Sequence, residues 1–289
     1  MKKKSNYSID QFCGIGDEAA PDITNQIKTH QQLGWNKLEL RSIDNIPLFL
    51  FSDLEMELIY KQIVQSNITI PIIDSTIGNW DKTISQSFQK DLKELKVLIK
   101  IAKKFNSNYI RIMSYPNDNL SDKDWESEVI KRICSMAKIA YNEGVVLLHE
   151  NCHGWAASDP FKALHLVDVT NGKGFGLLFD TGNPIVHNYN CLNYCKKILD
   201  HIKHVHIKDA VLSKNSKNEI FTFPGEGDAP ILECLKLLSD NGYKGLISIE
   251  PHLIFAPHKT LNIAQVKQKN IYIRYAHYLY SMLGDCFAN

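Results

Sequence analysis

The sequence lacks an excess of charge of either sign. Its 289 residues hold 33 Lys and Arg against 32 Asp and Glu, a formal net charge of +1. A protein that binds duplex DNA mainly through phosphate contacts normally carries a basic excess, so we expect no nucleic-acid partner. Hydrophobic residues make up 44% of the chain and charged residues 22%, which argues against global disorder and against a fibrous protein.

Long apolar runs are also missing. No apolar stretch approaches the ~20 residues that span a bilayer, so no membrane partner is predicted. The first residues, MKKKSNYSIDQF, are basic but lack the apolar run of a secretory signal, and we expect residues 1–6 to form a flexible basic tail. Seven scattered cysteines without a CxxC pair argue against a zinc module and for reduced thiols. These absences predict a cytoplasmic protein.

No linker rich in Pro, Ser or Gly divides the chain, so residues 1–289 are expected to form one domain. Short apolar runs alternate instead with longer amphipathic ones. Strands are predicted over residues 9–13, 37–41, 68–74, 109–113, 145–150, 174–180, 202–208 and 245–250. Helices are predicted over residues 22–33, 53–65, 85–105, 122–142, 160–169, 192–199, 229–239 and 262–283.

This alternation predicts the α/β class and a single (β/α)8 TIM barrel. An open, doubly wound sheet is the competing architecture. It would usually offer a glycine-rich first turn, and here Gly14 and Gly16 are not followed by the third glycine of that motif. The barrel is therefore the preferred prediction.

The chemistry of a barrel gathers at the carboxyl ends of its strands. Four consecutive predicted strands end in or carry an ionisable residue, and these residues are Glu150, Asp180, His206 and Glu250. Buried carboxylates side by side repel strongly unless a cation neutralises them. Three carboxylates and one imidazole suit Mn²⁺ or Mg²⁺ better than a thiolate site would. The alternative is that the four are ordinary polar residues at strand ends.

These motifs resemble those of the sugar phosphate isomerase/epimerase superfamily, the xylose isomerase-like TIM barrels. The group includes ketose 3-epimerases, hydroxypyruvate isomerase, inosose dehydratase and, more distantly, endonuclease IV. The resemblance runs through nearly the whole chain, and the residues that carry it are His149-Glu150-Asn151, Phe179-Asp180-Thr181-Gly182-Asn183, His204-Val205-His206-Ile207-Lys208-Asp209, Pro224-Gly225-Glu226-Gly227-Asp228 and Ile249-Glu250-Pro251-His252. Gly16-Asp17-Glu18 and Leu38-Glu39-Leu40-Arg41 resemble a bacterial branch of the group.

The resemblance implies that Glu150, Asp180, His206 and Glu250 bind one divalent metal, Mn²⁺ first, with Mg²⁺, Co²⁺ and Zn²⁺ as alternatives. It also implies that Glu150 and Glu250 transfer protons from opposite faces of the substrate. A metal makes the proton beside a carbonyl more acidic because it stabilises the enediolate that forms. The implied function is a metal-dependent isomerase or epimerase of a small hydroxy-carbonyl compound, a sugar or a sugar phosphate.

Three positions depart from the ketose 3-epimerases, which have His, Glu and Arg where this chain has Asn183, Ala156 and Leu212. Because those are substrate contacts in that family, a simple ketose 3-epimerase is disfavoured. Endonuclease IV is also disfavoured, since its additional zinc-binding histidines are missing here. A dehydratase acting on a keto-polyol through the same metal site, and a sugar-binding barrel without activity, remain the alternatives.

A further set of residues is expected to contact a carbohydrate-like substrate. Lys208 follows His206 by two residues and shares its face, and His252 stands in the same relation to Glu250. Arg41 and Arg111 lie at or within predicted strands, where a buried guanidinium needs an anionic partner. That partner is Glu39 or Glu18 of this chain, or a phosphate or carboxylate of the substrate. The full predicted substrate set is Lys208, His252, Arg111 and Asn183. A homo-oligomer is compatible with the sequence but not specified by it.

Overall fold

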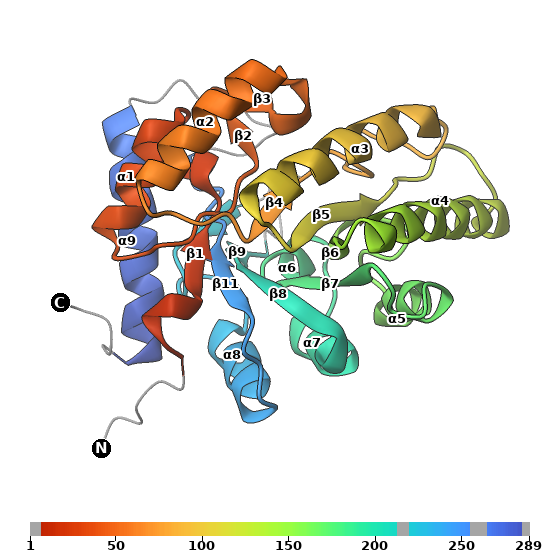
Figure 1. Cartoon of the computed structure of the whole chain (residues 1–289). Helices are drawn as coiled ribbons and strands as arrows, with labels where there is room; N and C mark the ends of the chain where they lie inside the picture. Colours follow the sequence, from red (N-terminus) through yellow and green to blue (C-terminus); the bar gives the residue numbers. More distant parts are fainter. Residues whose placement is uncertain (1–6, 213–219, 255–264, 285–289) are drawn as a thin grey trace.

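The computed structural model describes residues 7–212, 220–254 and 265–284, so the predicted tail at residues 1–6 lies outside it. Seven parallel strands form one curved sheet in the order β1-β11-β8-β7-β6-β5-β4, and helices surround it (Figure 1). The strands are β1 (Phe12–Gly14), β4 (Ile72–Asp74), β5 (Tyr109–Ser114), β6 (Val146–Gly154), β7 (Phe175–Asp180), β8 (Ile202–Ile207) and β11 (Leu246–Ile249). The longer helices are α1 (Ile23–Gln32), α2 (Asp53–Gln65), α3 (Phe88–Phe105), α4 (Asp122–Asn142), α5 (Pro160–Val169), α7 (Cys191–Ile198), α8 (Ile231–Asp240) and α9 (Gln265–Leu283).

An eighth segment, residues 37–41, closes the sheet between β1 and β4. It pairs with the β1 side through the parallel bridge Ile15↔Glu39 and with the β4 side through Lys37↔Thr69 and Leu40↔Ile73. The Glu39 amide donates to the Gly14 carbonyl at 3.0 Å. The predicted TIM barrel is confirmed, although its second strand is held by isolated bridges rather than by a continuous ladder.

Three helices begin and end at the predicted residues, and a capped first turn fixes where each of them begins. The Ser52 hydroxyl accepts from the Glu55 amide, and the Glu55 carboxylate accepts from the Ser52 amide, which fixes the start of α2. Ser121 caps α4 through its hydroxyl, and Asp159 caps α5 ahead of a proline in its first turn. Among the described residues, no helix has the length and apolar character that crossing a bilayer requires.

Several predicted boundaries are wrong. Residues Ile9–Gln11 form a short 3-10 helix rather than the start of a strand, because the Gln11 side chain accepts from the Ser8 amide and closes the turn. Strand β6 continues past Glu150 to Gly154, which pairs with Ser114 of β5. The sequence did not predict the hairpins β2 (Ser42–Ile43) with β3 (Ile46–Pro47) and β9 (Asp209–Val211) with β10 (Ile220–Thr222), or the one-turn helix α6 (Asn183–Val186).

Alternation along the strands separates the barrel interior from the helix layer. Residues two apart share a face, so the apolar residues Ile72, Leu148 and Leu178 lie on the same face as the acid two positions further along each strand. These three residues pack together as a small cluster of their own. The alternate residues Leu147, Leu177 and Phe179 pack in the larger core with the helices. An apolar layer therefore lies beneath a polar one, and the polar layer contains Asp74, Glu150 and Asp180.

Candidate metal centre

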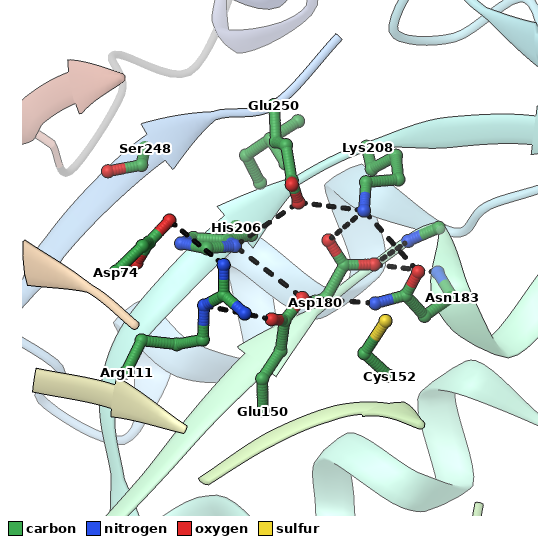
Figure 2. Close-up of polar contacts among 12 residues, drawn as sticks. Asp74, Arg111, Glu150, Cys152, Asp180, Asn183, His206, Lys208, Ser248 and Glu250 are labelled. Atoms are coloured by element: carbon green, nitrogen blue, oxygen red, sulfur yellow. Dashed lines mark hydrogen bonds and ion pairs between the residues drawn. The ribbon is translucent and has the colours of Figure 1, made fainter. Parts of the chain in front are cut away.

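The four ionisable residues at the strand ends meet at one point. Glu150 lies in β6, Asp180 ends β7, His206 lies in β8 and Glu250 directly follows β11. Each offers one ligand atom such that all four atoms lie within 4.8 Å of one another (Figure 2). All four side chains are buried. The separation along the chain, from β6 to the end of β11, is closed by the parallel ladders β6–β7, β7–β8 and β8–β11.

Three atoms of this group face one another without a regular hydrogen bond. They are Asp180 Oδ2, His206 Nδ1 and Glu250 Oε2. None of them makes a regular hydrogen bond within the described part of the chain, although Lys208 forms an ion pair with Glu250 Oε2 at 2.7 Å and lies 3.4 Å from Asp180 Oδ2. His206 Nδ1 lies 3.3 Å from Glu250 Oε2 and 3.7 Å from Glu150 Oε1. Buried polar atoms are nearly always satisfied, so such a set needs an explanation. Three carboxylates and one imidazole nitrogen, all converging, fit the donor preferences of a hard divalent cation.

The other nitrogen of His206 is held from below by a residue that the sequence did not assign to this role. His206 Nε2 lies 2.9 Å from Glu39 Oε1, and His204 Nε2 lies 2.9 Å from Glu39 Oε2. Ser248 also donates to the Glu39 carboxylate. Of the two acids considered as partners for the buried arginines, Glu18 pairs with Arg41 at 3.1 Å, whereas Glu39 holds the histidines instead of Arg111. The sequence does carry a signal for a buried polar role of Glu39, because this charged residue stands between Leu38 and Leu40 in a predicted buried strand.

Arg111 joins two acids instead. Its guanidinium lies 3.2 Å from Asp74 Oδ2 and 3.4 Å from Glu150 Oε2, and it donates to Asn79 at 3.1 Å. The side chain is almost fully buried. Arg111 thus faces the cavity, as expected for a substrate contact, but its anionic partners are protein carboxylates. It holds Glu150 against β4 and β5.

Lys208 lies among the predicted ligands. Its ammonium group is 2.7 Å from Glu250 Oε2 and 3.4 Å from Asp180 Oδ2, and it donates to Asn183 Oδ1 at 3.3 Å (Figure 2). Asn183 in turn donates to Glu150 Oε1 at 3.2 Å. A charged proton donor is therefore fixed beside the converging acids.

His252 and Arg41 flank Glu250 on its other side. His252 Nε2 lies 3.1 Å from Glu250 Oε1, and Arg41 Nη1 lies 2.9 Å from the same oxygen. The His252 backbone adopts φ 51°, in the left-handed region, and its amide donates to Glu18 at 2.7 Å. A left-handed non-glycine residue costs energy, so this contact with Glu18 helps to keep His252 beside the site.

The crowding of charge shifts the pKa values of the site in opposite directions. Burial would raise the pKa of Glu150, but Arg111 and His206 outweigh it and lower that pKa to about 2. Burial likewise opposes the ionisation of Glu250, and Lys208 and His252 hold its pKa well below the usual range. For Asp180 burial prevails over Lys208 and raises the pKa to about 6. Burial and Lys208 lower the pKa of His252 to about 3. Burial opposes the charged form of His206, but Glu39, Glu150 and Glu250 outweigh it and raise its pKa well above the usual value. Two glutamates therefore stay ionised, with one imidazole beside them that favours the charged form and another that stays neutral.

A cavity of about 460 Å³, counted to its open mouth, lies over this group. Its lining includes the four predicted substrate residues Lys208, His252, Arg111 and Asn183 and two of the predicted ligands. Trp80, His153, His187 and Phe221 form its aromatic wall. Trp155 does not belong to this wall, because it is buried among core residues.

Two neighbouring residues have the structural roles that their position suggests. His149 points away from the barrel interior, and its ring stacks on Phe175 at 6.5 Å between centroids. Asp209 accepts from the amides of Ala210, Gly225, Gly227 and Ala229, so it organises the loop after β10. Neither side chain belongs to the converging group of acids.

A family model described as a xylose isomerase-like TIM barrel matches residues 29–262. The chain belongs to this family. The match spans most of the barrel, from helix α1 to the segment that follows β11, and it agrees with the resemblance found from the strand-end motifs.

Curated proteins that are similar to the chain are named as enzymes. The chain is 26% identical over 146 residues to an inosose dehydratase of Clostridium perfringens, covering 45% of this chain and 48% of that protein. It is 28% identical over 164 residues to an inosose dehydratase of Lactiplantibacillus plantarum, covering 52% and 54%. The chain therefore spans about half the length of the curated relatives it matches.

Solved structures share the fold at low sequence identity. The IOLI protein, solved with a bound zinc atom, superposes with a TM-score of 0.75 at 16% identity, covering 96% of this chain and all of that one. A probable 3-DHS dehydratase, AsbF of Bacillus anthracis, superposes with a TM-score of 0.69 at 14% identity, covering 94% of this chain and 98% of that one. The 3-keto-D-glucoside 4-epimerase YcjR of E. coli superposes with a TM-score of 0.67 at 14% identity, covering 92% of this chain and 99% of that one. These likenesses establish the fold alone.

Proposed function

We propose that this chain binds one divalent cation, Mn²⁺ first, and removes water from a small polyhydroxylated carbonyl compound. The observation that carries the proposal is the convergence of Glu150, Asp180, His206 and Glu250 with Lys208 beside them. A cation held by the four ligands supplies Lewis acidity that stabilises negative charge on the substrate's oxygen. Dehydration is preferred to isomerisation because an ammonium donor lies next to the acids, and because the curated relatives are named dehydratases.

Glu150 is the proposed base. Its closest contacts are at 3.2 to 3.7 Å, whereas Glu250 is engaged by Lys208 at 2.7 Å and by Arg41 at 2.9 Å. A base needs an oxygen that can approach the proton it removes. Glu150 takes the proton from the carbon beside the carbonyl, and that C–H electron pair becomes a carbon–carbon double bond. The C–O bond of the neighbouring hydroxyl breaks, and Lys208 gives that oxygen a proton so that water leaves.

The test supplies Mn²⁺ and either an inosose or a dehydroshikimate, and records the absorbance of the conjugated enone product. Lys208→Met is the informative variant. It should still exchange the substrate's α-proton in D₂O but release water much more slowly, by the 10²–10⁴-fold that is roughly typical of a lost general acid. If neither absorbance change nor exchange occurs with any keto-polyol and metal tested, the proposal is wrong.

Epimerisation is the second candidate, and a specific observation favours it. Glu150 and Glu250 approach the site from β6 and from the end of β11, which are separated in the sheet by β7 and β8. One glutamate on each face of a planar intermediate would allow inversion at the carbon between them. Exchange of the α-proton with inversion, and without any enone absorbance, would establish this reaction and exclude dehydration.

A further inference from the structure

Glu39 lies underneath the proposed metal site and does not line the cavity above it. Its carboxylate has no exposed surface, yet it faces two imidazoles, each at 2.9 Å. One oxygen serves His206, and the other serves His204 and Ser248. A buried carboxylate is costly unless it is paired, so these contacts are what keep Glu39 ionised inside the barrel.

The contact with His206 determines which nitrogen carries the ring proton. A carboxylate accepts hydrogen bonds and cannot donate them, so the nitrogen that faces Glu39 must hold the hydrogen. That nitrogen is Nε2. Without a cation, Nδ1 also faces carboxylates and holds a proton by the same rule, whereas a cation bound at Nδ1 takes the place of that proton and leaves the one on Nε2. Nδ1 is the atom that faces Glu150 and Glu250 at 3.7 and 3.3 Å. Ligating histidines are typically held by such an outer partner.

A chain of contacts joins Glu39 to the opposite side of the site. Glu39, Asp74 and His206 offer atoms within 4.8 Å of one another, and Asp74 pairs with Arg111, which reaches Glu150. Glu39 thus contacts the proposed ligand His206 directly and is linked to a second one, Glu150, through Asp74 and Arg111. Simple neutralisation of two buried histidines would require only that a carboxylate be nearby. It would not require Glu39 Oε1 to face His206 Nε2, the ring nitrogen on the side away from Glu150 and Glu250.

We propose that Glu39 is a positioning residue, which fixes the ring orientation and the tautomer of His206 so that Nδ1 is presented to a divalent cation. This inference rests on the proposed metal site. It assigns Glu39 no contact with substrate and no proton transfer. Its consequence is that metal affinity depends on a side chain that never touches the metal.

The experiment measures Mn²⁺ affinity by calorimetry, without substrate, for the parent, Glu39→Gln and Ser248→Ala. The Gln side chain keeps the size of Glu39 but presents an uncharged group to both histidines. Affinity should fall by about 10–100-fold, the usual loss when an outer partner of a ligating histidine is removed. Ser248→Ala is the matched control, because it removes a buried hydrogen bond to the other oxygen of the same carboxylate. It should keep the parent affinity.

Each outcome decides a separate claim. Parent-like affinity in Glu39→Gln overturns the positioning role, and so does an equal loss in Ser248→Ala. A parent that binds no divalent cation overturns the proposed function itself. If Glu39→Gln does not fold, imidazole ¹⁵N spectra of the Zn²⁺-loaded parent still test the inference. A proton on Nε2 of His206 supports it, and a proton on Nδ1 overturns it.

Discussion

The two glutamates of the site have different partners, so their carboxylates differ in how firmly they are held in place. Glu150 has longer contacts, to Asn183, Arg111 and His206, whereas Glu250 is engaged at both oxygens by Lys208, Arg41 and His252. Replacement of either by Gln keeps one coordinating oxygen and removes a basic one. Both variants should retain most of their metal. Turnover should fall at least ~10²-fold in Glu150→Gln, as expected for a lost base, and equally in Glu250→Gln if the reaction is an epimerisation with one base on each face.

The measurement pairs turnover with metal content for Glu150→Gln and Glu250→Gln. Glu94→Gln is the control, since Glu94 is also buried but its hydrogen bonds go to Thr76, outside the site. An epimerase should lose inversion in both site variants yet keep exchange from the intact face, whereas a dehydratase that uses Glu150 should lose exchange in that variant alone. Parent-like turnover in both, with metal in place, would show that neither is the base.

At the scale of an element, the turn between β7 and α6 determines where Lys208 lies. A Cβ on Gly182 would meet Lys208 Cβ and Cγ at 2.7 Å and the Lys208 carbonyl carbon at 2.9 Å. The Gly182 amide also donates to Asp180 at 2.9 Å. Gly182→Ala should therefore push the turn away from β8, weaken metal binding and activity, and cost about 1–3 kcal/mol of stability, as overpacking does.

Gly172→Ala provides the comparison. Gly172 has φ +61°, and a Cβ added there would meet nothing within 4 Å, so this change costs about 1–2 kcal/mol through backbone strain alone. Its activity per folded molecule should equal that of the parent. Urea unfolding and turnover, measured for both variants, separate the two effects. Equal activity in Gly182→Ala and Gly172→Ala would contradict the proposed close packing of the turn against Lys208.

Elements with local signals were predictable, and those with distant partners were not. The starts of α2, α4 and α5 follow from the caps Ser52, Ser121 and Asp159, each of which acts within three residues. The four converging residues could be named because parallel strands bring their carboxyl ends to one rim. The role of Glu39 could not, since its partners His204 and His206 lie 165 and 167 residues away. Only the closed barrel brings them together.

At the scale of the whole molecule, a buried histidine outside the site makes stability depend on pH. His30 of α1 is fully buried, with Nδ1 2.9 Å from the Gln26 carbonyl and Nε2 3.1 Å from that of Gly14. Burial outweighs these carbonyls and lowers its pKa from 6.5 to about 4. Below pH 6.5 the unfolded chain takes up a proton that the folded chain refuses. Stability is therefore complete above pH 6.5 and declines towards pH 4.

The pKa of His30 is 6.5 in the unfolded chain and about 4 in the folded one. This difference corresponds to at most roughly 3 kcal/mol of unfolding free energy. His30→Gln removes the titrating ring but keeps a donor for the carbonyls, so its stability should fall less steeply between about pH 6.5 and 4.5. Urea unfolding at several pH values gives the slope. His277→Gln, at an exposed position, should leave the parent slope unchanged. Parallel curves for the parent and His30→Gln would refute this source of acid sensitivity.

The segment that closes the barrel also supplies two charged residues of the site. Residues 37–41 carry Glu39, which holds His206, and Arg41, which holds Glu250. These residues join their neighbours through isolated bridges rather than a full ladder, and they form the seam at which the sheet closes into a cylinder. In a folding intermediate in which only residues 37–41 are still unpaired, the four ligands already lie on one open sheet. His206 and Glu250 then lack their contacts with Glu39 and Arg41. We therefore expect tight cation binding to be acquired late in folding, at the moment when the cylinder shuts.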